Sequence, residues 1–416
     1  MVNTGPGMHS PTETLAEVSA GREIATHTVV VPQDIVDQII DELREDRETL
    51  KSCSLTHSTW LHRSRVYLHR SIALYHHHFQ THPTQLRKLY DKSTLSSISK
   101  YTEVLILEGR TNYKMFSLNE QWASRSVNEI RFWSAVSYFE HVTSLRVSRL
   151  SWPLQCSKEN KQRLQEAFRN ITRLDIHASD FTNAQEFLSF LSTFPALTRL
   201  EIRGVHWRET VEGWTAHSTQ GGYLQELSVR FCEGLVMFDV AKWLSAFQVS
   251  GMVKLHLSPA KDPDFRSLSV YCDAVGLSLR HMVLDIDCET NKEDVRAAAV
   301  SLEVLTELES ITFVDLGRRS SEAESIFWPC TLLLLQHVST KNLRVIRFRC
   351  QGDLALDDIK DWPALQVEAL LSRPAFSHVS SVEVTFSNVT SWRYRETARR
   401  ALLRLAARGI LKLASH

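Results

Sequence analysis

Residues 31–65 read VPQDIVDQIIDELREDRETLKSCSLTHSTWLHRSR, a pattern that predicts three short helices. Pro32 suits the first turn of a helix, where a missing N–H breaks no hydrogen bond, and helix-forming residues continue to Arg44. Four apolar residues recur at helical spacing and form one stripe of this first helix: Ile35, Ile39, Ile40 and Leu43. We expect a second helix from about Glu48 to Leu55 and a third around Trp60.

Helices of this size bury too little apolar surface to be stable alone. We expect this module to span residues 28–75 and to pack against a neighbouring unit or another protein. If that neighbour is another protein, the module is a docking unit. The alternative is an ordinary three-helix subdomain that belongs to a larger core.

The same residues resemble an F-box, in the form common in basidiomycete fungi. The spacing from Pro32 to Leu43 is similar to the first helix of that family. The segment CSLTHSTWLHRSR, from Cys53 to Arg65, is similar to its second half, and the likeness continues over RSIAL at residues 70–74. The chain departs from the family at Thr56-His57, where a small apolar residue and a Cys are usual. This departure puts one contact of the second helix in doubt.

The resemblance implies a protein partner. In this family the F-box binds the Skp adaptor of Skp–cullin–F-box ubiquitin ligases, which also hold cullin and RING subunits. The rest of the chain selects a target protein. We expect the following residues to contact the adaptor: Pro32, Ile35, Ile39, Leu43, Leu50, Leu55, Trp60 and Leu61.

The composition is typical of a globular protein that binds neither nucleic acid nor membranes. Of the 416 residues, 43% are hydrophobic, and 48 basic residues balance 48 acidic ones. No apolar run approaches the roughly 18 residues of a membrane span, and no secretory leader is evident. The seven cysteines are scattered and include no CxxC pair, which indicates reduced thiols. We therefore expect a cytoplasmic or nuclear protein, with a flexible leader at residues 1–27.

A short apolar pattern, [LIVM]-x-x-[LIVM]-x-[LIVF], repeats through the remainder of the chain. Its central residues are Leu145, Leu174, Leu200, Leu227, Leu255, Met282, Ile311, Ile346 and Val382. Neighbouring centres lie 26 to 29 residues apart up to Ile311, and then 35 and 36 residues apart. A looser copy surrounds Leu105, and Ile72 is a candidate for the start of the series.

Helical segments separate the copies, as at residues 184–194, 238–247 and 294–305. One strand and one helix at this period resemble an irregular leucine-rich repeat, in which the Asn or Cys after the strand is mostly missing. For residues 76–392 we expect an α/β solenoid, with parallel strands on the concave side and helices on the convex side. A doubly wound α/β sheet without repeats is the alternative.

The C-terminal residues 393–416 are expected to cap this solenoid. They predict an arginine-rich amphipathic helix, followed by Gly409 and a short apolar strand. The apolar side of the helix comprises Leu402, Leu403, Leu405 and Ala406. A basic amphipathic helix also suits a membrane surface or a partner, but its place after the last repeat favours the cap.

Signals for catalysis are scarce. The sequence lacks the GxxxxGK[ST], GxGxxG, GxSxG and HExxH motifs. The histidines at 76, 77, 78 and 82 are candidates for a metal site, but three consecutive side chains do not converge on one ion in regular structure. Asp285 and Asp287 continue a repeat strand, and Asp262 and Asp264 mark a turn. We therefore expect no enzyme activity, no metal and no cofactor.

Polar residues alternate with apolar ones in the repeat strands, and we expect them to face away from the helices. One column across the strands comprises Arg146, Asp175, Glu201, Ser228, His256, Thr312, Arg347 and Glu383. The next comprises Ser148, His177, Arg203, Arg230, Ser258, Asp285, Arg349 and Thr385. Ordinary cross-strand pairing explains most of these charges. A more specific hypothesis is that Arg199, Arg203 and Arg230 bind an acidic or phosphorylated peptide.

Two functions follow from these patterns. The first is the substrate-recognition subunit of a Skp–cullin–F-box ubiquitin ligase, which brings a target close to the ubiquitin donor and does no chemistry itself. The second is a repeat scaffold that binds the Skp adaptor or other proteins without supporting ubiquitin transfer.

Overall fold

A computed structural model gives the structure of the chain. It describes residues 31–75, 92–109, 132, 135–150, 162, 166–209, 223–247, 251–258, 263–286, 292–315, 327–338, 340–350, 363–387 and 392–415. The expected leader at residues 1–27 and the histidines at 76, 77, 78 and 82 lie outside the described residues.

The chain divides into two compact units, with the boundary between Arg63 and Ser64. The first unit contains helices α1 (Gln33–Glu42) and α2 (Arg47–Thr56), and helix α3 (Ser58–Leu68) begins in it. The three helices predicted for this stretch are thus confirmed. The boundary falls within α3, so the third helix is continuous with the second unit.

A small apolar core and an ion pair between α1 and α3 hold the first unit together. Its buried apolar side chains are Val36, Ile40, Leu50 and Cys53. Arg63 of α3 donates from Nε and Nη2 to the two carboxylate oxygens of Asp41 on α1, each at 2.7 Å. A bidentate pair fixes orientation as well as charge. Arg63 of the WLHRSR segment therefore holds α3 against α1.

The second unit contains a parallel sheet of 12 strands. In spatial order these are β1 (Ser71–Tyr75), β2 (Val104–Glu108), β3 (Ser144–Ser148), β4 (Arg173–His177), β6 (Arg199–Arg203), β8 (Glu226–Arg230), β9 (Lys254–Ser258), β10 (His281–Ile286), β11 (Ser310–Asp315), β12 (Val345–Cys350), β13 (Ser381–Phe386) and β14 (Leu411–Ser415). Two short strands, β5 (Asp180–Phe181) and β7 (His206–Trp207), form a separate parallel pair.

The predicted strand centres lie in a single row across this sheet. Leu145 pairs in register with Leu174, and the row continues through every predicted centre to Val382. It also includes Ile72 and Leu105, so both candidate early copies are confirmed as strands. From Leu105 to Val382 no side chain in the row exceeds 1% exposure. A slip of one residue would turn this buried row to the other face, so burial holds the register.

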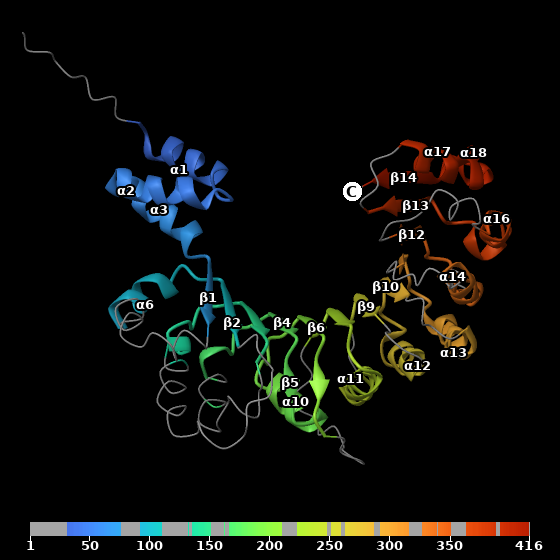
Figure 1. Cartoon of the computed structure of the whole chain (residues 1–416), viewed down its shortest axis with the longest axis horizontal. Helices are drawn as coiled ribbons and strands as arrows, with labels where there is room; N and C mark the ends of the chain where they lie inside the picture. Colours follow the sequence, from blue (N-terminus) through green and yellow to red (C-terminus); the bar gives the residue numbers. More distant parts are fainter. Residues whose placement is uncertain are drawn as a thin grey trace, which may run out of the picture. The chain divides into compact units, whose positions relative to one another are not determined.

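Helices connect the strands, and α10 to α16 follow one side of the sheet (Figure 1). Their bounds are α6 (Lys92–Ser99), α10 (Ala184–Leu191), α11 (Gly234–Phe247), α12 (Pro263–Val275), α13 (Lys292–Ala299), α14 (Phe327–Gln336), α16 (Ala364–Leu371), α17 (Trp392–Ala401) and α18 (Leu403–Ala407). The segment expected as one helix at 294–305 is α13 followed by a 3₁₀ helix, Val300–Val304. The turn expected at Asp262 to Asp264 is wrong for its last two residues, because Pro263 and Asp264 begin α12, where proline is tolerated, whereas Asp262 lies outside the described residues.

The C-terminal segment differs in detail from the single helix expected. It forms α17 and α18, which meet at Leu402, and β14 then pairs with β13. The carboxylate of Glu368 on α16 accepts a hydrogen bond from the backbone N–H of Arg404 at 2.6 Å. Leu402 and Leu405 are buried as expected, whereas Leu403 is 65% exposed. The expected apolar side is wrong at Leu403, because the break at Leu402 changes the phase of the helix that follows.

Candidate functional site

Helix α1 presents apolar residues to its own core and to solvent. Val36 and Ile40 are at most 2% exposed, whereas Ile35 and Ile39 are each 42% exposed. Adjacent residues on a helix differ by about 100° in direction, so the predicted single stripe becomes two rows. We call Ile35 and Ile39 the outer row of α1. Two isoleucines left in solvent on one helix have the character of a contact surface rather than of a core.

The other residues expected to contact an adaptor fall into three groups. Pro32 and Leu55 are exposed, and the Leu55 side chain is 87% accessible. Leu43, Trp60 and Leu61 are half-buried. Leu50 is only 1% exposed, so its expected contact with a partner is wrong in this conformation. Sequence spacing placed Leu50 on an apolar face, but the packing of α2 turns that face into the core.

The second candidate surface is the face of the sheet formed by the alternating polar positions, which we call the open face. The register aligns both predicted columns strand by strand. Several neighbours in these columns carry opposite charges. Arg347 Nε lies 2.7 Å from Glu383 Oε2, and Arg146 Nη2 lies 3.4 Å from Asp175 Oδ2. Ordinary cross-strand pairing therefore accounts for these parts of the open face.

A buried carboxylate organises the open face at β10. Asp285 is 1% exposed and accepts a hydrogen bond from His256 Nε2 on β9 at 2.8 Å. Its other oxygen, Oδ2, lies 3.7 Å from Arg230 Nε on β8. Arg230 reaches Asp285 across β9, where Ser258 occupies the intervening register position. Sequence reasoning placed all these residues on one face but did not predict that they surround Asp285.

His256, Asp285 and Ser258 invite comparison with a nucleophilic triad. Such a triad requires the serine hydroxyl to donate to the histidine, so that the imidazole takes its proton. Ser258 Oγ is buried and forms no hydrogen bond within the described part of the chain. The three side chains therefore lack the proton relay that this chemistry needs.

The three arginines expected to act together do not form one group. Arg199 and Arg203 occupy opposite ends of β6, and Arg199 Nε lies 3.1 Å from Glu226 Oε2. Four residues along a strand separate two side chains by about 13 Å, too far for one small ligand. Arg203 and Arg230 are register partners on β6 and β8. Arg203 and Arg230 therefore form a pair apart from Arg199, and the expected contact of Arg199 with an acidic or phosphorylated peptide stays a prediction.

Phe231, which the sequence pattern did not single out, lies close to both of these arginines. The guanidinium carbons of Arg203 and Arg230 each lie 5.4 Å from the centroid of its ring. Its backbone φ is +51°, a conformation that bulky residues rarely adopt. The neighbouring strand has Gly204 at the matching position, with φ +57°. Only the tertiary structure brings the side chains of Arg203, Arg230 and Phe231 together.

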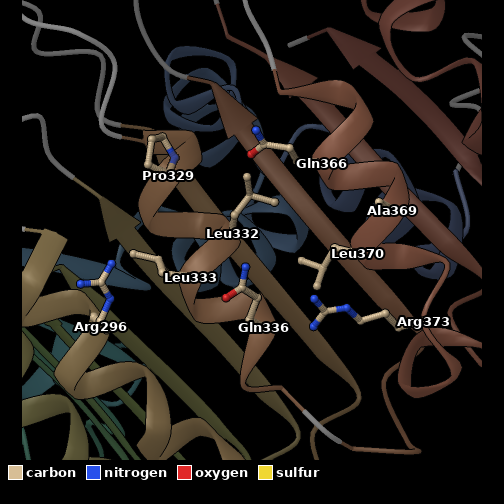
Figure 2. A pocket seen from close by; sticks show the side chains of 9 residues that line it. All are labelled: Arg296, Pro329, Leu332, Leu333, Gln336, Gln366, Ala369, Leu370 and Arg373. Carbon is tan, nitrogen blue, oxygen red and sulfur yellow. The ribbon is translucent and has the colours of Figure 1, made fainter.

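A shallow groove on the helical side is a further candidate. Its lining residues are Arg296, Pro329, Leu332, Leu333, Gln336, Gln366, Ala369, Leu370 and Arg373 (Figure 2). The groove separates α14 from α16, with Arg296 contributed by α13. Arg296 already pairs with Glu293 at 2.7 Å. The lining thus combines leucine and alanine side chains with two glutamines and two arginines.

The described residues contain no cluster of three or more His, Cys, Asp or Glu side chains that would hold a metal ion. Within the same ranges, none of the helices has both the length and the apolar character needed to cross a bilayer.

The fold defines the class of the chain as an α/β protein built on a twelve-stranded parallel sheet. No protein-family model matches the chain, and no curated protein matches it.

Proposed function

We propose that this chain is the substrate-recognition subunit of a Skp–cullin–F-box ubiquitin ligase, in the cytoplasm or nucleus. The first unit binds the Skp adaptor as an F-box, and the leucine-rich-repeat-like second unit binds a target protein. The chain contributes proximity and no bond-making group. Holding a target beside the ubiquitin donor raises its effective concentration, which is sufficient for such a subunit.

The observation that carries the proposal is the outer row of α1. Ile35 and Ile39 remain 42% exposed while Val36 and Ile40 complete the core of the unit. Full burial of one such side chain contributes about 1.5–3 kcal/mol, so a partner that covers both gains a substantial part of its affinity there. Leu55 on α2, at 87% exposure, supplies a further apolar contact.

The test is capture of a purified Skp adaptor by the full chain. The double variant Ile35→Asp/Ile39→Asp should lose capture, because two charges would be buried in an apolar contact. Leu235→Asp is the matched control, since Leu235 on α11 is 41% exposed and lies in the other unit. Wild-type protein that captures no adaptor, or a double variant that captures it normally, would overturn the proposal.

The scaffold without ubiquitin transfer is the second candidate, and the departure at Thr56-His57 favours it. Thr56 ends α2, and His57 continues as extended backbone. If the end of α2 docks differently, adaptor binding can persist in a geometry that cullin and RING subunits do not use. Reconstitution with these subunits separates the two candidates, since only the first predicts ubiquitin transfer to a bound target.

A further inference from the structure

Arg203 and Arg230 present like charges at the same register position of neighbouring strands. Like charges directly opposite each other in a sheet are destabilising. Arg173 and Arg199 are also register partners, but each has a carboxylate of its own at 3.1 Å, on Asp175 and Glu226 respectively. The pair at Arg203 and Arg230 therefore has less compensation among the described residues than the pair at Arg173 and Arg199.

The hydrogen-bonding capacity of this pair is incompletely used. Within the described residues, no carboxylate oxygen lies within 4 Å of the Arg203 guanidinium, and Arg230 has only the 3.7 Å approach to Asp285. The Nε atoms of both arginines are buried and make no hydrogen bond there. Buried donors without acceptors are uncommon in folded proteins and call for a specific reason. The Arg230 side chain is still 23% exposed, so a ligand can reach its guanidinium.

Phe231 places the two guanidinium groups on a common support. Both cations lie within reach of the same ring, whose electron-rich face attracts each of them. The left-handed backbone at Phe231 is a feature of the repeat, because the residues that follow β3, β4 and β6, which are Arg149, Ala178 and Gly204, also have positive φ. The choice of side chain is what distinguishes Phe231 from these residues. The ring contact with two arginines is a reason for phenylalanine at this position.

The charges around the pair favour a ligand with more than one negative charge. His177 is the register neighbour of Arg203 on the other side and lies 3.9 Å from Glu201. The nearby Asp285 uses Oδ1 for the bond with His256, and its Oδ2, at 3.7 Å from Arg230 Nε, offsets part of the positive charge of the pair. A phosphate ester carries a charge of about −1.5 to −2 and three acceptor oxygens, which suits two guanidinium groups. A carboxylate has one charge, which a single arginine can satisfy with two hydrogen bonds.

From this arrangement we propose that Arg203, Arg230 and Phe231 bind a phosphorylated side chain of a partner peptide on the open face. The inference deepens the proposed function by naming the class of target that the second unit selects. The binding itself does not require the adaptor, so it is measured on the chain alone.

The test is titration of the full chain with a capped phosphoserine, N-acetyl-phosphoserine amide, followed by NMR of arginine side chains labelled with ¹⁵N. Capped serine, capped aspartate and inorganic phosphate are titrated at the same ionic strength. We expect saturable binding of the capped phosphoserine, and weaker or no binding of capped serine and aspartate. Equal binding of aspartate, or binding of inorganic phosphate alone, would overturn the assignment to a phosphorylated side chain.

Variants identify the residues. Arg203→Gln and Arg230→Gln should each weaken binding by about tenfold, since each removes a charge-assisted contact. Arg199→Gln is the matched control on the same strand and should leave binding unchanged. An equal loss in all three variants would indicate a general effect of positive charge and would overturn the site.

Phe231→Gly tests the contribution of the ring apart from that of the backbone conformation. It keeps the left-handed conformation without strain, so the midpoint of urea unfolding should not fall much, while binding of the capped phosphoserine weakens. Unchanged binding would remove Phe231 from the site. Ile35→Asp/Ile39→Asp should bind the capped phosphoserine normally, so loss of adaptor capture and loss of phosphate binding are distinguishable failures.

Discussion

His256 Nε2 and Asp285 Oδ1 are joined by a 2.8 Å hydrogen bond between neighbouring strands, and Asp285 is 1% exposed. The bond supplies a partner to a carboxylate that the sheet has removed from water. A buried carboxylate without such a partner is strongly destabilising. The open face at β9 and β10 therefore depends on this pair for stability.

His256→Ala should destabilise the full chain by about 1–3 kcal/mol, because it leaves both carboxylate oxygens of the buried Asp285 without a hydrogen bond from the described residues. The measurement is the free energy of unfolding from urea titration. Arg347→Ala is the comparison, since Arg347 bonds a more exposed carboxylate, Glu383, and should cost less. An equal loss of unfolding free energy in the two variants would contradict the argument that the buried Asp285 depends on His256.

Leu50 and Leu55 should respond oppositely to truncation, although both were expected to contact the adaptor. Leu50→Ala creates a cavity in the core of the first unit and should cost about 2–5 kcal/mol of stability. Leu55→Ala should change stability by less than about 0.5 kcal/mol and weaken adaptor capture instead. Urea unfolding and adaptor capture on the same preparations check both. A stable Leu50→Ala variant would contradict the packing of α2.

Gly109 should not tolerate a side chain. A Cβ at Gly109 would lie 2.0 Å from the backbone oxygen of Arg149, so the end of β2 would have to move away from β3. We expect Gly109→Ala to cost about 1–3 kcal/mol through this clash. At Gly204 the nearest atom is 3.9 Å from a Cβ, so Gly204→Ala meets only backbone strain. It should cost about 1 kcal/mol, and a larger cost than at Gly109 would refute the steric argument.

His177 should make the second unit less stable in acid. Burial lowers the pKa of its imidazole below the usual 6.5, and nearby Arg146 and Arg203 act in the same direction against the opposing effect of Glu201. The unfolded chain therefore binds a proton at a higher pH than the folded chain. The contribution of His177 to the free energy of unfolding is complete above the pKa of its imidazole in the unfolded chain, and it decreases as the pH drops below that pKa.

The corresponding measurement compares urea midpoints at pH values above and below 6.5 for wild type and His177→Gln. The variant has no proton to take up at this position, so its midpoint should fall less on acidification. An identical fall in both proteins would show that His177 does not contribute.

Periodicity along the chain was enough to place the strands. Each repeat must bury its central apolar residue, and a parallel sheet gives those residues one row, so Leu145 through Val382 align as spacing predicts. The same logic placed Arg203, Arg230 and Asp285 on one face. It worked because alternation along a strand is a local property of the backbone.

Which side chains meet is decided across strands, by distances that no local pattern contains. Arg199 shares a strand with Arg203, but it pairs with Glu226 at the other end of that strand. Phe231 has a left-handed backbone conformation, and its ring lies near Arg203 and Arg230. Leu50 and Ile39 are both apolar residues at helical spacing, yet one is core and the other surface. The direction in which each helix packs determines that difference, and packing depends on the whole chain.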